Sequence, residues 1–262
     1  MTRRIWLIST AVGLFLAGCC EEGSGVLVQE TRSVERFGGL RLDLPGTVQV
    51  SQGPASPLKI RTDDNLIDRV ITSVDEDGAL VIKADEEDCC IEPTELVVQV
   101  SSPELRELVI DGSGDAVLRG TFESDREISL EIDGSGSIAA DRLAADDIHL
   151  AIDGSGVIDA TLDAGRLRTS LDGSGHIQLA GTAEEHSIAI DGSGDVEAMA
   201  LDTATTLIDI DGSGECAVAA GELLEVSIDG SGEVSFCGQP RVSQSIDGSG
   251  SVEEASRSRC EP

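Results

Sequence analysis

The chain has 262 residues with 50 acidic and 18 basic side chains, which give a formal net charge of −32. This charge excludes nucleic acid as an expected partner, because a phosphate backbone would be repelled, and it argues against electrostatic docking on anionic lipid. Tyrosine is absent, the one tryptophan is Trp6, and there are four phenylalanines. With so few rings, an aromatic stacking platform for sugars or bases is not expected.

Residues 1–18 are predicted to be a lipoprotein signal peptide. Arg3 and Arg4 precede an apolar run from Ile5 to Leu16 that is too short to span a bilayer comfortably. Leu-Ala-Gly-Cys at residues 16–19 resembles the lipobox of bacterial lipoproteins, which implies cleavage before Cys19 and its diacylation. An ordinary signal peptide or an uncleaved anchor is the alternative. We expect residues 19–33 to hold the lipidated Cys19 and a flexible tether, so that the protein contacts the membrane through lipid.

Residues 34–250 are predicted to form one elongated β domain. The stretch from Leu40 to Val50 has the alternation of the later repeats, with a degenerate turn, so the repeated structure is expected to begin here. Further strands are predicted at 58–61, 79–84 and 95–100, with a turn at 75–78 between two of them. Residues 65–70 fit either a short helix or a bent strand.

The phrase Ile-Asp-Gly-Ser-Gly begins at Ile110 and occurs eight times, with Leu171 replacing Ile in the fourth copy. Successive motif aspartates are separated by 22, 20, 19, 19, 20, 18 and 18 residues, which predicts a repeat architecture. These aspartates are Asp111, Asp133, Asp153, Asp172, Asp191, Asp211, Asp229 and Asp247. The turn glycines are Gly112, Gly114, Gly134, Gly136, Gly154, Gly156, Gly173, Gly175, Gly192, Gly194, Gly212, Gly214, Gly230, Gly232, Gly248 and Gly250.

Apolar residues flank each copy with a period of two. The positions one and three before each aspartate are mostly Ile or Leu, and the positions five and seven after it are mostly apolar. A period of two predicts a strand on each side of a tight Gly-rich turn, and no helix-period segment separates the copies. We therefore predict an all-β fold, a single-stranded parallel β-helix (β-solenoid) with about 19–20 residues per coil, whose apolar columns become interior ladders.

In such a solenoid the eight motif aspartates form a row of like charges that must be solvated, screened or bound to cations. One interpretation is that each Asp and Ser caps its own turn while the glycines make the bend. The alternative is that neighbouring carboxylates chelate Ca²⁺ together with backbone carbonyls, because hard cations prefer oxygen ligands. Calcium β-rolls of toxins also combine Gly and Asp, but their motif differs and recurs every nine residues. No other cofactor is expected.

If Cys19 carries lipid, six cysteines remain in a compartment that permits disulfides. Cys216 occupies an interior column and is predicted to be a small buried hydrophobe. Cys237 and Cys260 could pin the last coil or stay free. Cys89 and Cys90 are adjacent loop cysteines that could pair with each other or elsewhere, and a metal site there would lack a nearby histidine. Cys20 remains unassigned. The three histidines share no repeat position and are interpreted as surface or filler residues.

Residues 251–262 are predicted to be a polar C-terminal cap or tail. Apart from Val252 and Ala255, this segment is polar. A solenoid needs a polar terminal cover to prevent end-to-end stacking, and this segment is a candidate for that role.

The segment that precedes the repeats, which we call the entry segment, adds a resemblance to a known family. Phe37-Gly38-Gly39 and the stretch Gly46 to Gly53, followed by strands separated by Gly-Ser-Gly turns, resemble the bacterial putative auto-transporter adhesin, head GIN domain family. The resemblance covers roughly residues 34–250. It implies a right-handed β-helix in an exported, often lipid-anchored protein of mostly Gram-negative bacteria. It implies no catalytic residues.

The expected function is that of a non-catalytic, lipid-anchored β-solenoid of the bacterial cell envelope, with the outer membrane as its expected location. It would act as an adhesin, an envelope scaffold or a binding module for an unknown surface or envelope ligand. A calcium-stabilised surface module is one alternative. A polysaccharide-active β-helix enzyme is another, but such an enzyme requires a local, non-repeating cluster of acids and bases, whereas these carboxylates repeat uniformly.

Overall fold

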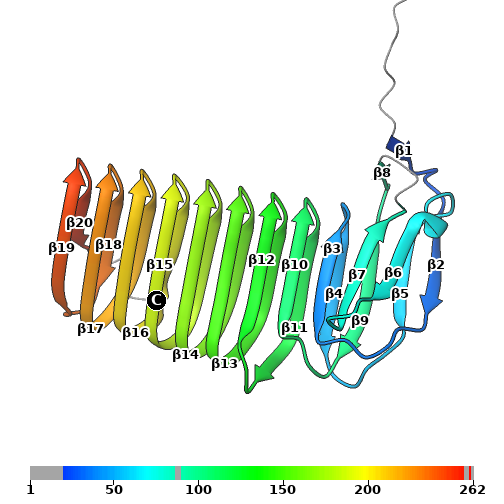
Figure 1. Ribbon diagram of the computed structural model, residues 1–262, viewed down its shortest axis with the longest axis horizontal. Coiled ribbons are helices and arrows are strands. Elements are labelled where there is room, and N and C mark those ends of the chain that lie inside the picture. Colours follow the sequence, from blue (N-terminus) through cyan, green and yellow to red (C-terminus); the bar gives the residue numbers. More distant parts are fainter. Residues whose placement is uncertain (1–19, 86–89, 257–259, 261–262) are drawn as a thin grey trace, which may run out of the picture.

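The computed structural model describes residues 20–85, 90–256 and 260, and Figure 1 shows them as one elongated stack of strands. The signal peptide, Cys19 and Cys89 lie outside the described residues. The N-terminal elements are β1 (Cys20–Glu22), β2 (Leu27–Arg32), β3 (Gly39–Asp43), β4 (Thr47–Gln52), β5 (Leu58–Asp63), the 3-10 helix η1 (Ile67–Arg69), β6 (Val70–Val74), β7 (Ala79–Ala84), β8 (Cys90–Glu92) and β9 (Val97–Ser102). Among these described segments, no helix is long and apolar enough to cross a membrane.

The repeats form β10 (Glu107–Gly112), β11 (Asp115–Ser124), β12 (Ile128–Gly134), β13 (Ser137–Gly154), β14 (Val157–Gly173), β15 (His176–Gly192), β16 (Asp195–Gly212), β17 (Glu215–Gly230), β18 (Glu233–Cys237), β19 (Arg241–Gly248) and β20 (Ser251–Glu254). Each of β13 to β17 runs around most of one coil and pairs in parallel with the next. The predicted β-solenoid is confirmed, with about 7 turns of parallel coils.

The apolar columns form the core, as their alternation predicted. Seven members of the column that precedes the motif aspartate, from Ile110 to Ile228, are buried. In the last coil, Ile246 is only partly buried because no further coil packs on it. Burying one such side chain contributes about 1.5–3 kcal/mol, so a coil is stable only when neighbours cover both of its faces.

The differences in repeat length are accommodated outside the motif. All eight motif aspartates pair in register from coil to coil. Register shifts occur instead after the turn, for example between Leu118 and Thr121 and between Ala198 and Asp202. Bulges on that side let coils of different length stack without moving the motif.

The N-terminal end does not follow chain order. β3 and β4 form the coil next to β10 and β11, as expected for the stretch from Leu40 to Val50. The chain then leaves the stack and returns as β7 and β9, which pair with the outer edges of β3 and β4. The antiparallel pairs β2–β5, β5–β9 and β6–β7 build up this end of the molecule (Figure 1). Residues 65–70, whose pattern fits either a short helix or a bent strand, contain η1 and the first residue of β6.

The expected flexible tether at 19–33 is wrong for its described part. β1 pairs with β8, and a disulfide joins Cys20 to Cys90, which resolves the pairing left open for these two cysteines. The buried Asp63 carboxylate accepts hydrogen bonds from the backbone N–H of Gly25 and of Thr94, each at 2.7 Å. Burial alone would raise the pKa of Asp63, but these N–H donors outweigh it and lower the pKa. Residues 20–32 are thus fastened to the body.

Two titratable side chains, Cys216 and His186, are buried inside the repeated coils among the residues that the structure describes. Cys216 is a buried free thiol, as predicted, and burial raises its pKa. His186 is 0% exposed and takes an interior position between Leu167 and Thr206 of the adjacent coils. Its Nε2 lies 2.9 Å from Thr169 Oγ1, while Nδ1 has no hydrogen-bond partner among the described residues. Burial lowers the pKa of His186 to about 3.

Acid should therefore destabilise the domain partly through His186. The folded-state pKa lies below the ordinary value of 6.5, so its contribution to the free energy of unfolding is complete above pH 6.5 and is lost between pH 6.5 and about 3. The slope is at most about 1.4 kcal/mol per pH unit. His186→Leu is expected to flatten this dependence, measured as denaturation midpoints from pH 7 to 4. Equal slopes for the two proteins would mean that the imidazole is solvated in the folded state.

Candidate functional site

The repeated turn is held by its glycines and by backbone hydrogen bonds between coils. The first glycine of each copy has positive φ, for example +131° at Gly212. A Cβ on Gly212 would lie 2.2 Å from the carbonyl oxygen of Gly192 in the preceding coil. That carbonyl accepts a hydrogen bond from the N–H of Ser213 at 2.7 Å. The glycines are therefore required for the turns to stack on one another.

Core packing leaves no room for a side chain at the second glycine of each copy. On Gly214 a Cβ would lie 2.7 Å from Ile190 Cγ2 and 2.8 Å from the Gly194 carbonyl oxygen. This glycine is buried in all the inner copies. Stacking and core packing thus account for the Gly-Ser-Gly part of the motif without a ligand.

The motif aspartates do not share this structural role. All eight are exposed, and across the described residues their carboxylates form no hydrogen bond or ion pair. The interpretation that each Asp caps its own turn is therefore wrong. Among the described residues the motif serine hydroxyls do not cap the turns either, and the one hydrogen bond that they form joins the hydroxyls of Ser174 and Ser193 at 3.2 Å. The structure instead presents a solvated row of carboxylates along one edge of the solenoid.

Removing one charge from this row should leave the fold intact. Asp172→Asn deletes a carboxylate that has no hydrogen-bond or ion-pair partner among the described residues and lies between Asp153 and Asp191 in register. We expect a change in the free energy of unfolding within about 0.5 kcal/mol, because exposed substitutions away from contacts have small effects. Thermal unfolding of the variant tests this, with Ser174→Ala as the control from the same turn. A loss above about 1 kcal/mol would give the carboxylate a structural role.

The row of motif aspartates brings one carboxylate per coil to this edge of the solenoid. In the part of the chain that the structure describes, no group of three or more His, Cys, Asp or Glu side chains is arranged to hold a metal ion. Ca²⁺ takes six to eight oxygen ligands in proteins.

Removal of divalent cations is accordingly expected to leave the melting temperature unchanged. The measurement is thermal unfolding of the chain with EDTA and then with excess Ca²⁺, at constant ionic strength. Excess Mg²⁺ is the control for general screening of the carboxylates. A rise in melting temperature that requires Ca²⁺ and not Mg²⁺ would assign the row as a calcium site.

The charges divide the solenoid into two halves. In the first half, arginines form ion pairs between neighbouring coils, including Arg119–Asp141 at 3.4 Å and Arg166–Asp147 at 2.9 Å. Residues 169–240 contain 14 acidic residues and neither Lys nor Arg. The C-terminal half, residues 169–240, therefore presents an acidic surface with no Lys or Arg of its own. At its border Glu185 forms an ion pair with Arg166 of the preceding coil at 3.9 Å.

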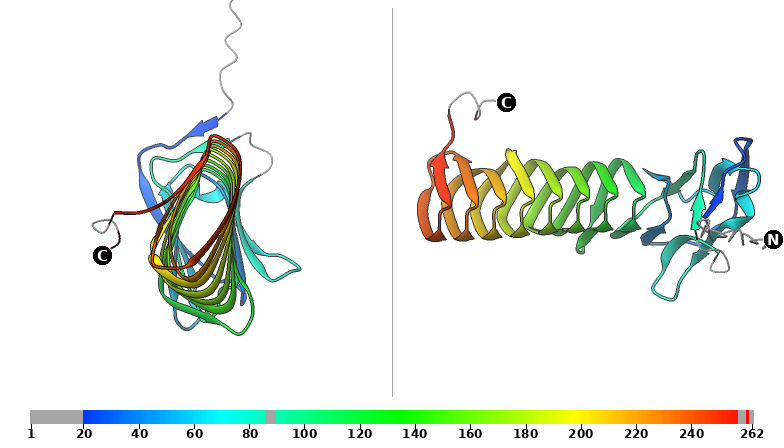
Figure 2. Two further views of the ribbon diagram at one scale, coloured as in Figure 1. Left: turned by 90° about the vertical axis from the view of Figure 1, so that its left-hand side faces the viewer. Right: turned by 90° about the horizontal axis from the view of Figure 1, so that it is seen from above.

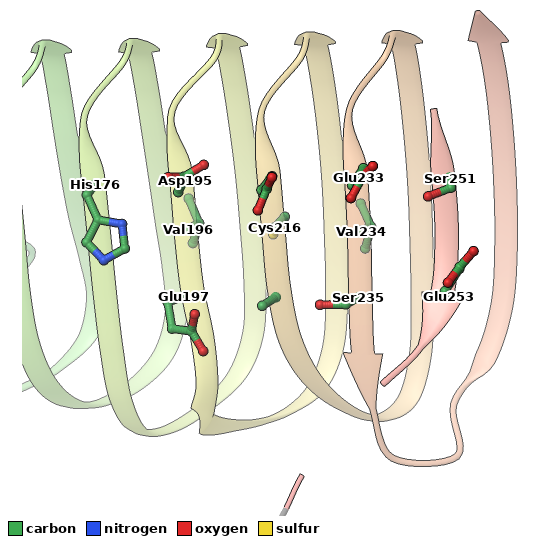
Figure 3. Close-up of a pocket in the computed structure, with 12 residues that line it drawn as sticks. His176, Asp195, Val196, Glu197, Cys216, Glu233, Val234, Ser235, Ser251 and Glu253 are labelled. Atoms are coloured by element: carbon green, nitrogen blue, oxygen red, sulfur yellow. The ribbon is translucent and has the colours of Figure 1, made fainter. Parts of the chain in front are cut away.

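The acidic half includes a shallow hollow on the strand that follows the turn (Figure 3). Asp195, Glu215 and Glu233 pair in register across three coils there, with Glu197 and Glu253 beside them. The hollow measures about 260 Å³ and is open, which is smaller than the usual pocket for a small molecule. The sequence pattern did not lead to a prediction of this second acidic ladder. Its signals were the stretch without Lys or Arg and the acids four residues after Asp191, Asp211 and Asp229.

A repeated parallel coil with a buried apolar core, Gly-Ser-Gly turns and exposed rows of carboxylates defines a parallel β-solenoid. The family profile that matches residues 36–240 is described as "Putative auto-transporter adhesin, head GIN domain". The chain belongs to this family, which confirms the resemblance seen in its repeats and entry segment.

Solved structures share the same fold. A Parabacteroides distasonis protein described as a "putative lipid binding protein" is 27% identical, with a TM-score of 0.85, and the match covers 90% of this chain and 99% of that one. A "putative adhesin" from Parabacteroides merdae is 22% identical, with a TM-score of 0.85 and the same coverage. Another from P. distasonis is 24% identical, with a TM-score of 0.82, and the match covers 89% of this chain and 99% of that one. No curated protein matches the chain.

Proposed function

We propose that this protein is a non-catalytic, lipid-anchored β-solenoid of the bacterial cell envelope that presents its acidic half to a surface or envelope partner. The observation that carries the proposal is the pair of in-register acidic ladders in the C-terminal half. Rigid repetition of one chemical group suits multivalent contact, since each further contact is made at high effective concentration. The complementary partner would be cationic or would bind through bridging cations.

The proposed anchor acts at the opposite end of the molecule. A diacylated Cys19 would lie one residue before Cys20, whose disulfide to Cys90 ties it to the body. β1 and β8 lie beside the N-terminal end of the stack (Figure 1). Lipid attached there would hold that end at the membrane, and the acidic half would lie farther from it. This arrangement also keeps the most acidic surface away from anionic headgroups.

Catalysis is not part of the proposal, because the acids repeat uniformly. The hollow of Figure 3 is lined by five carboxylates and His176, without a basic Lys or Arg among its lining residues. A polysaccharide-active site would need an acid, a base or an arginine in distinct positions around a cleft. Lipid binding is likewise not carried over from the P. distasonis protein, since buried side chains fill the interior columns that are described.

Protease shaving of intact cells that express the tagged full-length chain tests the placement, with a periplasmic protein as the leakage control. Loss of the tag with an intact control supports surface exposure and adhesion. Protection of the tag supports an envelope scaffold facing the periplasm and removes adhesion. Metabolic labelling with a fatty-acid analogue tests the anchor: Cys19→Ser should abolish the label, while Cys20→Ser should retain it. A label that persists in Cys19→Ser would refute lipidation at this residue.

A further inference from the structure

The last coil has an edge that no other coil covers. β19 pairs on one side with β17, and its other side ends the stack (Figure 1). Val242 is 39% exposed, whereas Leu224, its counterpart in the preceding coil, is 0% exposed. Gln244 is exposed in the column where the preceding coil buries Val226. An uncovered strand edge offers backbone N–H and C=O groups to another strand.

The described part of the C-terminal segment does not cover this edge. The N–H of Ala255 donates a hydrogen bond to the carbonyl oxygen of Phe236 in β18. A disulfide joins Cys260 to Cys237 at the end of β18, which is one of the two outcomes left open for this pair of cysteines. Seen along the axis, the chain beyond β20 leaves the coil sideways (Figure 2). The surface of β19 is thus open at Val242.

We propose that β19 pairs antiparallel with β19 of a second copy of this chain, about a two-fold axis at Gln244. Two copies that use the same edge give an isologous contact, in which antiparallel pairing follows from the two-fold symmetry. In this register Gln244 opposes itself and Val242 opposes Ile246 of the second copy. Ser243 opposes Ser245, and Arg241 opposes Asp247.

Both the alternation and the charges select this register. A shift by one residue would set interior side chains against outward-facing ones. A shift by two in one direction would place Arg241 opposite Ser245. A shift by two in the other direction would place Asp247 opposite Ser243 and leave Arg241 unpaired. Arg241 makes no ion pair among the described residues and follows 72 residues without Lys or Arg. An arginine and an aspartate at opposite ends of one edge strand are complementary to a second copy in antiparallel orientation.

The other sheet of the last coil limits the contact to β19. If the two solenoids met end to end on a common axis, Glu253 and Glu254 of β20 would lie against the same residues of the second copy. Like charges directly opposed across strands are destabilising. The two solenoids therefore meet along β19 and diverge on the β20 side. This inference does not depend on the proposed function.

Cross-linking of the full-length chain in cells tests the register. Gln244→Cys places a cysteine opposite itself, where paired Cα atoms are about 4.5–5.5 Å apart, within disulfide range. With an added disulfide oxidant, a dimer band that is sensitive to reduction is expected on a gel. Ser243→Cys is the matched control, since its own copy lies diagonally at about 7–8 Å, and it should cross-link weakly. No dimer from Gln244→Cys, or equal dimer from both variants, would overturn the proposal.

A charge exchange tests the pairing independently. The molar mass of full-length chain in detergent is measured by light scattering over a concentration series. Wild type should be dimeric at high concentration, Arg241→Asp and Asp247→Arg should weaken dimerisation at least tenfold, and the double variant should restore it. Asp229→Arg, the same change one coil inside the stack, should leave the mass unchanged. A monomeric wild type, or dimerisation insensitive to both single changes, would refute the contact.

Discussion

Gly212→Ala is expected to lower the free energy of unfolding by about 2–6 kcal/mol. The backbone at φ +131° belongs to a region that L side chains rarely adopt, which costs on the order of 1–3 kcal/mol. The added Cβ would also lie 2.2 Å from the Gly192 carbonyl oxygen, and forcing the coils apart adds about 1–3 kcal/mol. Chemical denaturation followed by circular dichroism measures the loss.

Gly112→Ala separates these two causes. Gly112 also has positive φ, at +104°, but nothing lies within 4 Å of a Cβ built on it. This variant should therefore show only the backbone cost, about 1–3 kcal/mol. Ser213→Ala controls for the neighbouring position in the Gly212 turn. If Gly112→Ala and Gly212→Ala lost the same stability, stacking against the preceding glycine carbonyl would not constrain the motif.

Ile190→Asp is expected to prevent stable folding of the coils around it. Ile190 is 2% exposed and lies in register between Leu171 and Ile210 in the neighbouring coils. The change loses about 1.5–3 kcal/mol of apolar burial and places an unpaired carboxylate in the core at a cost of several kcal/mol more. That sum approaches the whole stability of an ordinary domain. Thermal melts and limited proteolysis should show unfolding at room temperature.

Ala189→Asp is the matched control for this change. It adds the same carboxylate one residue earlier, where the side chain is exposed on the outer face. Only the small repulsion from neighbouring acids is expected, within about 1 kcal/mol. Loss of folding in both variants would mean that added charge, and not core burial, destabilises the solenoid.

The alternation of apolar residues was sufficient to predict the stacked coils and their interior. A strand sends successive side chains to opposite faces, so the sequence positions of Ile132, Ile138 and their equivalents determine which side is buried. The repeated Gly-Ser-Gly likewise predicted tight turns. For the motif aspartate the capping interpretation was wrong and the solvated row was right. A short polar side chain in a turn can cap the backbone or face solvent, and only the stacked geometry distinguishes these outcomes.

The N-terminal end shows where the pattern failed. β7 and β9 lie outside β3 and β4 although they follow them in the chain, because each of these strands has the same alternation and can pair with any of the others. Residues 20–32 were expected to be a flexible tether, but their strand pairing and the Cys20–Cys90 bond fasten them to the body. Which cysteines meet depends on contacts between residues far apart in sequence.

The sequence by itself determined the coil, its apolar columns, the exposed charge and the motif for lipidation at Cys19. These are local properties, set by strand alternation, by turn chemistry and by composition. Only the tertiary structure decided that Asp195, Glu215 and Glu233 form a second ladder, that His186 is buried, and that the edge of β19 is left open. Those features depend on which coil lies beside which, and on where the stack ends, and therefore require the register between coils.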